Sequence, residues 1–179
     1  MSKNGLTISL NEVLFYFTRA GFGVNASIGV SEDFARSNIW IAQNGFDPSE
    51  CSLLALDNLD SQTSSLSIKF EKTSDGSHLF CPEDKVLSAI EASVSCVDWL
   101  EFNGLDGDLK LTNVDSPLLV VSALGANQCT GIQVSWTDKS NNHYEVNLKD
   151  DIEWEIISSS EAPIELSNYA DIHISAFDV

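Results

Sequence analysis

The chain has 179 residues, which suits one domain large enough to bury a substantial hydrophobic core. It carries 27 acidic residues against 9 basic ones, so its formal net charge is −18. This charge disfavours partnership with nucleic acid or with an anionic membrane surface, because both attract lysine and arginine. The acidic surface is expected mainly to keep the protein soluble, and a docking face for a basic partner is the alternative.

Cysteine and histidine usage gives no sign of a metal site. No two of the four cysteines form a CxxC pair, and the three histidines lie far apart, so no metal ligand set is predicted. The cysteines are expected to be buried, reduced thiols (Cys51, Cys81, Cys96, Cys129). The first residues show no apolar signal core, and no apolar run reaches the roughly 18 residues of a membrane span. A cytoplasmic location is therefore predicted.

Three helices are predicted in the first sixty residues. Residues 9–12 read Ser-Leu-Asn-Glu, a capping box that begins a helix ending near Gly21 and Gly23. A second helix is expected from residue 27 or 31 to residue 44. Residues 47–48, Asp-Pro, indicate the start of a third helix that runs to about residue 56.

Strand signals dominate the remainder of the chain. Alternating apolar and polar residues predict a strand at 66–71 and a hairpin formed by residues 132–136 and 144–148. Further strands are expected near residues 109–111, 152–156 and 172–174. A helix is predicted to begin at Pro82 and to carry Val86 and Leu87 on its apolar face. Residues 117–125 fit either a helix or a strand, with the helix slightly favoured.

This order of elements predicts an α+β fold in one domain spanning residues 1–179. A helical N-terminal part, residues 1–60, would be followed by a mainly antiparallel β-sheet with one or two packed helices in residues 61–179.

A glycine motif at residues 21–26 formally matches the G-x-G-x-x-A dinucleotide fingerprint. The capping box before it predicts a helix in place of the required strand, and no second strand with an acidic end follows at the right distance. A glycine-rich corner between two helices is therefore the favoured interpretation, and no cofactor is expected.

The bend between the first two helices supplies the candidate ligand site. Arg19 and Asn25 lie beside exposed amides there, an arrangement that suits a small carboxylate or phosphate. The alternative is that Arg19 forms a structural ion pair with Glu12 or Glu32. These two glutamates are also a weak candidate for an acid–base pair. No nucleophile elbow is present, and Cys81 with His78 nearby is expected to be inert.

The N-terminal pattern resembles a bacterial family of small cytoplasmic proteins whose domain has no assigned function. The matching segments are residues 9–12, 19–23 (Arg-Ala-Gly-Phe-Gly), 31–35 and 39–41, followed by Gly45. Residues 116–119 and 134–136 also fit the pattern. Residues 37–39 depart from the alanine-rich helix of that family. The resemblance implies a stand-alone bacterial protein and draws attention to Glu12, Arg19 and Glu32, but it implies no activity.

The sequence therefore favours a binding or accessory protein for a small anionic metabolite or a partner protein. The alternatives are a small cofactor-independent enzyme (a lyase, isomerase or hydrolase) that uses carboxylates and Arg19, and a subunit active only within a complex. The sequence leaves the oligomeric state open.

The excess of negative charge predicts a salt-dependent stability. Repulsion between 27 acidic side chains weakens the compact state, and added salt screens that repulsion. We expect the midpoint of thermal unfolding to rise between 20 and 300 mM NaCl, roughly one decade of ionic strength. A midpoint that falls over this range would contradict the expectation.

Overall fold

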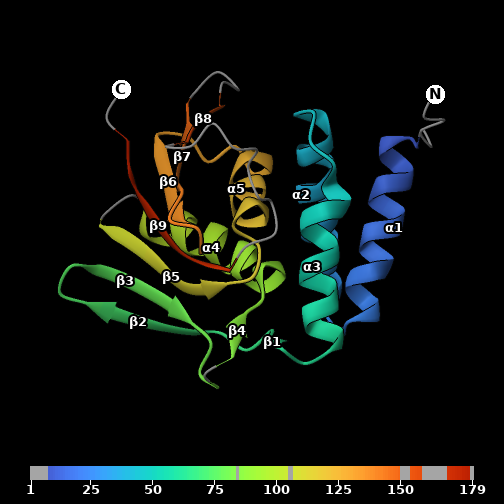
Figure 1. The fold of residues 1–179 in the computed structure, drawn as a ribbon, viewed down its shortest axis with the longest axis horizontal. Helices are drawn as coiled ribbons and strands as arrows, with labels where there is room; N and C mark the ends of the chain where they lie inside the picture. The colour runs from blue at the N-terminus through green and yellow to red at the C-terminus, as the bar shows by residue number, and fades with distance from the viewer. Residues whose placement is uncertain (1–7, 84, 105–106, 150–153, 159–168, 178–179) are drawn as a thin grey trace.

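The computed structural model describes residues 8–83, 85–104, 107–149, 154–158 and 169–177 (Figure 1). The helices are α1 (Leu10–Gly23), α2 (Ile28–Gln43), α3 (Pro48–Asp60), α4 (Ala89–Asn103) and α5 (Pro117–Ala126). The strands are β1 (Ser64–Ser65), β2 (Lys69–Thr73), β3 (Gly76–Phe80), β4 (Val86–Leu87), β5 (Asp108–Val114), β6 (Ile132–Thr137), β7 (His143–Leu148), β8 (Trp154–Ser158) and β9 (Ala170–Ala176).

The first three helices confirm the capping signals of the sequence. The backbone N–H of Glu12 donates to the Ser9 hydroxyl at 3.3 Å, and the backbone N–H of Ser9 donates to the Glu12 carboxylate at 2.7 Å. Ser27 caps α2, and Asp47 caps α3 with Pro48 at its first turn. Figure 1 shows α1 at the outer edge of the molecule, with α2 and α3 between it and the rest of the fold.

The glycine motif forms a helix–helix corner, as expected. Gly21 lies inside α1, and a Cβ atom placed on it would lie 2.9 Å from the Ser31 Cβ and 3.1 Å from the Ser31 Cα of α2. The backbone N–H groups of Val24 and Ala26 turn back to the Gly21 carbonyl. The motif therefore follows a helix, and its first glycine allows α1 and α2 to approach closely.

The prediction of a mainly antiparallel sheet was wrong, because the sheet is mixed. Its strand order is β1-β4-β5-β9-β6-β7-β8, and β3 also pairs with β5 while β2 pairs with β3. Strands β1 and β4, β3 and β5, and β4 and β5 pair in parallel. Parallel strands need a crossover, and α4 supplies it between β4 and β5.

The same error concerns the start of α4. Val86 and Leu87 were predicted to lie on a helix, but they form β4, and Leu87 pairs with Val114 of β5. The helix begins only at Ala89. Ser88 is its N-cap residue, and the Ser88 hydroxyl accepts a hydrogen bond from the Ile90 backbone N–H. Pairing of strands distant in sequence overrides the local helical pattern here.

Other elements agree with the sequence, with small shifts. Residues 117–125 form α5, so the preference for a helix is confirmed, and β6 and β7 form the predicted hairpin. The strand expected at 66–71 is β2 at residues 69–73. The last strand, β9, lies between β5 and β6. Residue 152 of the strand expected at 152–156 lies outside the described residues.

The core lies around α4 and α5, which Figure 1 shows between the sheet and the α2–α3 pair. In α5, every residue from Pro117 to Leu124 is buried. A helix that is apolar around its whole circumference must be covered on all sides. Helices α2 and α4 pack against α5 and provide most of that cover, and α3 makes a smaller contact.

Two glycines of α1 offer a matched test of the corner. We expect Gly21→Ala to lower the free energy of unfolding by about 1–3 kcal/mol, because its methyl group would collide with the Ser31 backbone. Gly23→Ala, in the same helix, has nothing within 4 Å of its Cβ and should be neutral or stabilising by up to about 1 kcal/mol. Urea unfolding followed by circular dichroism measures both. Equal effects of the two substitutions would contradict close packing at Gly21.

Candidate functional site

The residues predicted to bind an anion lie on separate parts of the helical corner. The Glu12 carboxylate belongs to the capping box, and hydrogen bonds from the Ser9 backbone and side chain lower its pKa. The Arg19 guanidinium lies 4.7 Å from the centroid of the Phe15 ring. Asn25 is exposed at a positive φ of 67°, and Glu32 is exposed on α2.

Within the described part of the chain, no ion pair joins Arg19 to Glu12 or Glu32. The expected structural pairing is therefore not observed there. Neither do the polar groups of Glu12, Arg19, Asn25 and Glu32 make hydrogen bonds to one another among those residues. Ligand binding at this loop stays a prediction.

A cleft between α2 and α5 has a more convergent set of side chains. Its volume is about 370 Å³. Helix α2 contributes Arg36, Ile39, Trp40 and Gln43, which share one face of the helix because they are three, four and seven residues apart. The opposite wall is formed by residues 125, 126 and 128 at the end of α5.

The wall of this cleft depends on a glycine. A Cβ atom placed on Gly125 would lie 2.4 Å from Cε2 and 2.6 Å from Nε1 of Trp40. The indole ring therefore packs directly on the α5 backbone. A rigid aromatic wall beside polar groups is typical of small-molecule sites.

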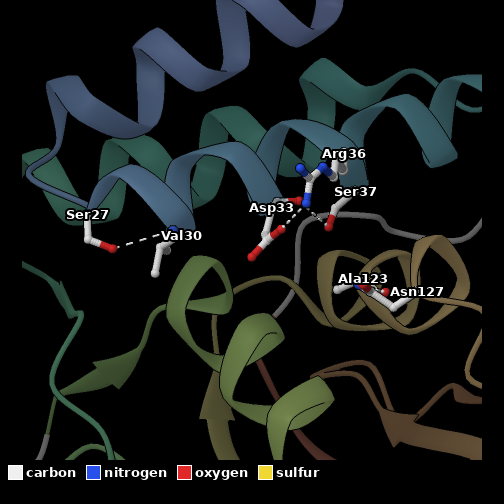
Figure 2. Close-up of polar contacts among 7 residues, drawn as sticks. All are labelled: Ser27, Val30, Asp33, Arg36, Ser37, Ala123 and Asn127. Carbon is white, nitrogen blue, oxygen red and sulfur yellow. Dashed lines mark hydrogen bonds and ion pairs between the residues drawn. The ribbon is translucent and has the colours of Figure 1, made fainter. Parts of the chain in front are cut away.

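Arg36 supplies the positive charge of the cleft. Its Nη1 atom lies 2.9 Å from Oδ1 of Asp33, one turn earlier on α2, and 61% of the Arg36 side chain is exposed. Figure 2 shows Asp33, Arg36 and Ser37 together on α2, with Ala123 and Asn127 across from them on α5. An exposed pair of this kind contributes at most about 1 kcal/mol, so an incoming carboxylate can compete with Asp33 for the guanidinium.

The two helices both end at this cleft, which gives it a second electrostatic feature. Gln43 is the last residue of α2, and Ala126 is the last of α5. Carbonyl groups at a helix C-terminus carry partial negative charge, which attracts hydrogen-bond donors and opposes a nearby carboxylate. The Asn127 side chain already donates to the Ala123 carbonyl at 2.8 Å, and backbone N–H groups donate to the carbonyls of Trp40 and Gly125. A carboxylate in this cleft must therefore be held by the Arg36 guanidinium, and only the second lone pair of these carbonyls can accept from a donor group.

This cleft was not predicted from the sequence. The chain contains only two arginines, Arg19 and Arg36, and only the first was considered as a ligand-binding residue. The spacing of Arg36, Trp40 and Gln43 on one helical face was the available signal. The contribution of Gly125 could not be read, because it lies 85 residues from Trp40 (125 − 40).

A second hollow of about 360 Å³ lies between α4 and the β2–β3 hairpin. Phe70 of β2 and Phe102 of α4 line it, and Phe102 is 89% exposed. Asp98 and Asn103 provide polar groups in this hollow, but it contains no cationic side chain among the described residues that line it.

A buried carboxylate, Asp115, lies where several elements meet. Its Oδ1 atom accepts a 2.8 Å hydrogen bond from the Ala89 backbone N–H at the start of α4. Within the described structure its Oδ2 atom has no hydrogen-bond partner, and neither do the buried Asn58 Nδ2 and Ser64 Oγ nearby. Burial raises the pKa of Asp115 to about 6, and the hydrogen bond from the Ala89 N–H partly offsets this effect. The sequence analysis did not single out this residue.

The cysteines do not form a reactive centre in the described structure. Cys51, Cys81 and Cys96 are buried, as expected, and Cys129 is partly buried. Burial raises the pKa of the Cys51 thiol to about 11, which keeps it protonated at neutral pH. His78 donates to or accepts from the Thr112 hydroxyl at 2.7 Å and stacks on Phe80.

The described residues contain no group of three or more histidine, cysteine, aspartate or glutamate side chains placed to hold a metal ion. None of their helices combines the length and apolar character that crossing a membrane requires.

The fold resembles about half of several solved dehydrogenases and reductases. Malate dehydrogenase from Pyrococcus horikoshii OT3 matches with a TM-score of 0.60 and 10% identity, over 92% of this chain and 53% of that protein. Sulfolactate dehydrogenase from Methanocaldococcus jannaschii matches at 0.55 and 10%, over 89% and 52%. Δ1-Piperideine-2-carboxylate reductase from Pseudomonas syringae matches at 0.56 and 10%, over 86% and 53%.

The chain spans about half the length of these solved proteins. At such low identity the likeness concerns the fold alone. No family model matches the sequence, and no curated protein matches it.

The raised pKa of Asp115 predicts that the stability of the fold depends on pH. Its pKa is higher in the folded protein than its ordinary value of 3.8, so its contribution to stability is greatest in acid and is lost as pH rises through about 6. Between pH 5 and 7.5 this loss amounts to roughly 1 kcal/mol. An asparagine side chain at this position would keep an acceptor for the Ala89 N–H without titrating. Between pH 5 and 7.5 the unfolding free energy of the natural protein should therefore fall by about 1 kcal/mol more than that of Asp115→Asn.

Urea unfolding of both proteins at the two pH values measures this difference. The informative quantity is the difference between the two proteins, since the other carboxylates titrate equally in each. A difference in unfolding free energy that does not change with pH would show that Asp115 is ionised in folded and unfolded chains alike.

Proposed function

We propose that the protein binds a small carboxylic acid that carries a hydroxyl or N–H donor, in the cleft between α2 and α5. The observation that carries the proposal is the position of Arg36 beside Trp40 and two helix ends in one cleft of about 370 Å³. The carboxylate would bind the guanidinium, and the apolar part of the ligand would lie against the indole. The hydroxyl or N–H group would donate to the carbonyl-rich helix ends.

The names of the structural neighbours support this ligand class. Malate and sulfolactate are 2-hydroxy acids, and piperideine-2-carboxylate is a carboxylate next to a ring nitrogen. Each combines a carboxylate with a second polar group close by. The neighbours are about twice as long as this chain, so the proposal concerns ligand binding and leaves turnover aside.

The two arginines allow a sharp comparison. Isothermal titration with L-malate and with L-lactate should detect binding, and Arg36→Gln should weaken it at least tenfold, which is about 1.4 kcal/mol. Arg19→Gln is the matched control, because it removes the other guanidinium at an exposed helical position. Loss of binding in Arg19→Gln but not in Arg36→Gln would overturn the proposal and favour the glycine bend.

A second substitution is expected to strengthen binding instead of weakening it. Asp33→Asn removes the carboxylate that now pairs with Arg36, so it should tighten malate binding severalfold. Succinate lacks the hydroxyl group of malate and should bind more weakly. Failure of every acid to bind the natural protein at millimolar concentration would refute the proposal.

A further inference from the structure

Helix α1 has two apolar faces, and only one of them is covered. Val13 and Gly21 are buried against α2. On the opposite side, Phe15 and Phe22 are 53% and 44% exposed. They are seven residues apart, which is close to two helical turns, so they form one stripe along the helix. Ile8, which is 40% exposed, precedes the N-cap residue Ser9 and so lies outside the helix.

Helix α1 exposes more large hydrophobic residues than any other described element. Five of the ten exposed large hydrophobic residues among those described lie on α1, and a sixth, Ile8, precedes its cap. The five on α1 are Leu10, Leu14, Phe15, Tyr16 and Phe22. Figure 1 places α1 at the outer edge of the fold, so the side facing away from α2 is open to a partner. Apolar patches of this extent on a soluble protein usually mark an interaction surface.

The charges on this surface point to its occupant. Residues 8–31 contain one acidic residue, Glu12, and one basic residue, Arg19, so this region is neutral. The other 26 acidic residues (27 − 1) all lie beyond residue 31. A second copy of the chain is strongly repelled elsewhere, but it can approach α1 without facing a local excess of negative charge.

Glu12 and Arg19 also make the stripe self-complementary. They are seven residues apart, so they lie on the same flank of the stripe. When two copies of α1 pack antiparallel about a two-fold axis near Phe15, Glu12 of each copy lies within about 1.5 Å, along the axis, of the level of Arg19 in the other. Phe15 of one copy then packs on Phe15 of the other. The arrangement combines two opposite-charge pairs with a central apolar contact.

We propose that the protein forms a symmetric homodimer in which the two α1 helices pack antiparallel along the Phe15–Phe22 stripe. A helix of 14 residues is about 21 Å long, so the interface is small. The dissociation constant is therefore expected on the order of micromolar to tens of micromolar.

Sedimentation equilibrium of the intact chain, in 0.3 M NaCl to screen long-range repulsion, tests the proposal. Phe15→Ser should raise the dimer dissociation constant at least tenfold. Phe102→Ser removes a more exposed phenylalanine on α4 and should leave the dissociation constant unchanged. A natural protein that remains monomeric at 200 µM would overturn the proposal, and so would a dimer weakened by Phe102→Ser but not by Phe15→Ser.

A charge variant tests the antiparallel register. Arg19→Glu places two glutamates opposite each other at both ends of the interface, so it should weaken the dimer at least tenfold. Adding Glu12→Gln removes that repulsion, and a glutamine at this position preserves the capping box. The double variant should therefore dimerise more tightly than Arg19→Glu alone. A double variant that is weaker still would overturn the register, while circular dichroism confirms that α1 remains helical in each case.

Discussion

The crossover from β4 through α4 to β5 is the constraint on which the rest of the fold depends. The Asp115 backbone N–H donates to the Leu87 carbonyl at 3.2 Å, and the Asp115 side chain accepts from the Ala89 N–H at 2.8 Å. The end of β5 is thereby tied to both sides of the start of α4. Helix α5 begins two residues after Asp115, so its buried position follows from this junction. Retaining a carboxylate there costs stability through desolvation, but it holds three elements in register.

Signals that act within a few residues could be read from the sequence. The capping box at Ser9, the Asp47–Pro48 start and the β6–β7 hairpin depend on contacts between near neighbours. The same is true of the glycine corner, where a capped helix before Gly21 argued against a nucleotide loop. These features are decided by local geometry, so a single sequence contains most of the information needed to predict them.

Features that depend on distant residues were misread or missed. Strand β4 is two residues long and exists because Leu87 pairs with Val114, while the local pattern around it favours a helix. Strand β9 inserts between β5 and β6, a position that no local pattern reveals. The α2–α5 cleft likewise depends on residues that are distant in sequence. Arg36 and Trp40 could be placed on one helical face, but nothing near them indicated that the bare backbone at Gly125 lies opposite.

Helix α2 connects the two proposed activities while keeping them separate. It covers the buried face of α1 with one side, and with another it contributes four residues to the cleft. The stripe on α1 faces away from α2, so a second copy docked there leaves the cleft open. The two arginines divide accordingly, because Arg19 lies on the outer helix beside Phe15 and Arg36 lies on the inner helix beside the cleft. The two proposals therefore rest on different arginines, and single substitutions can test them separately.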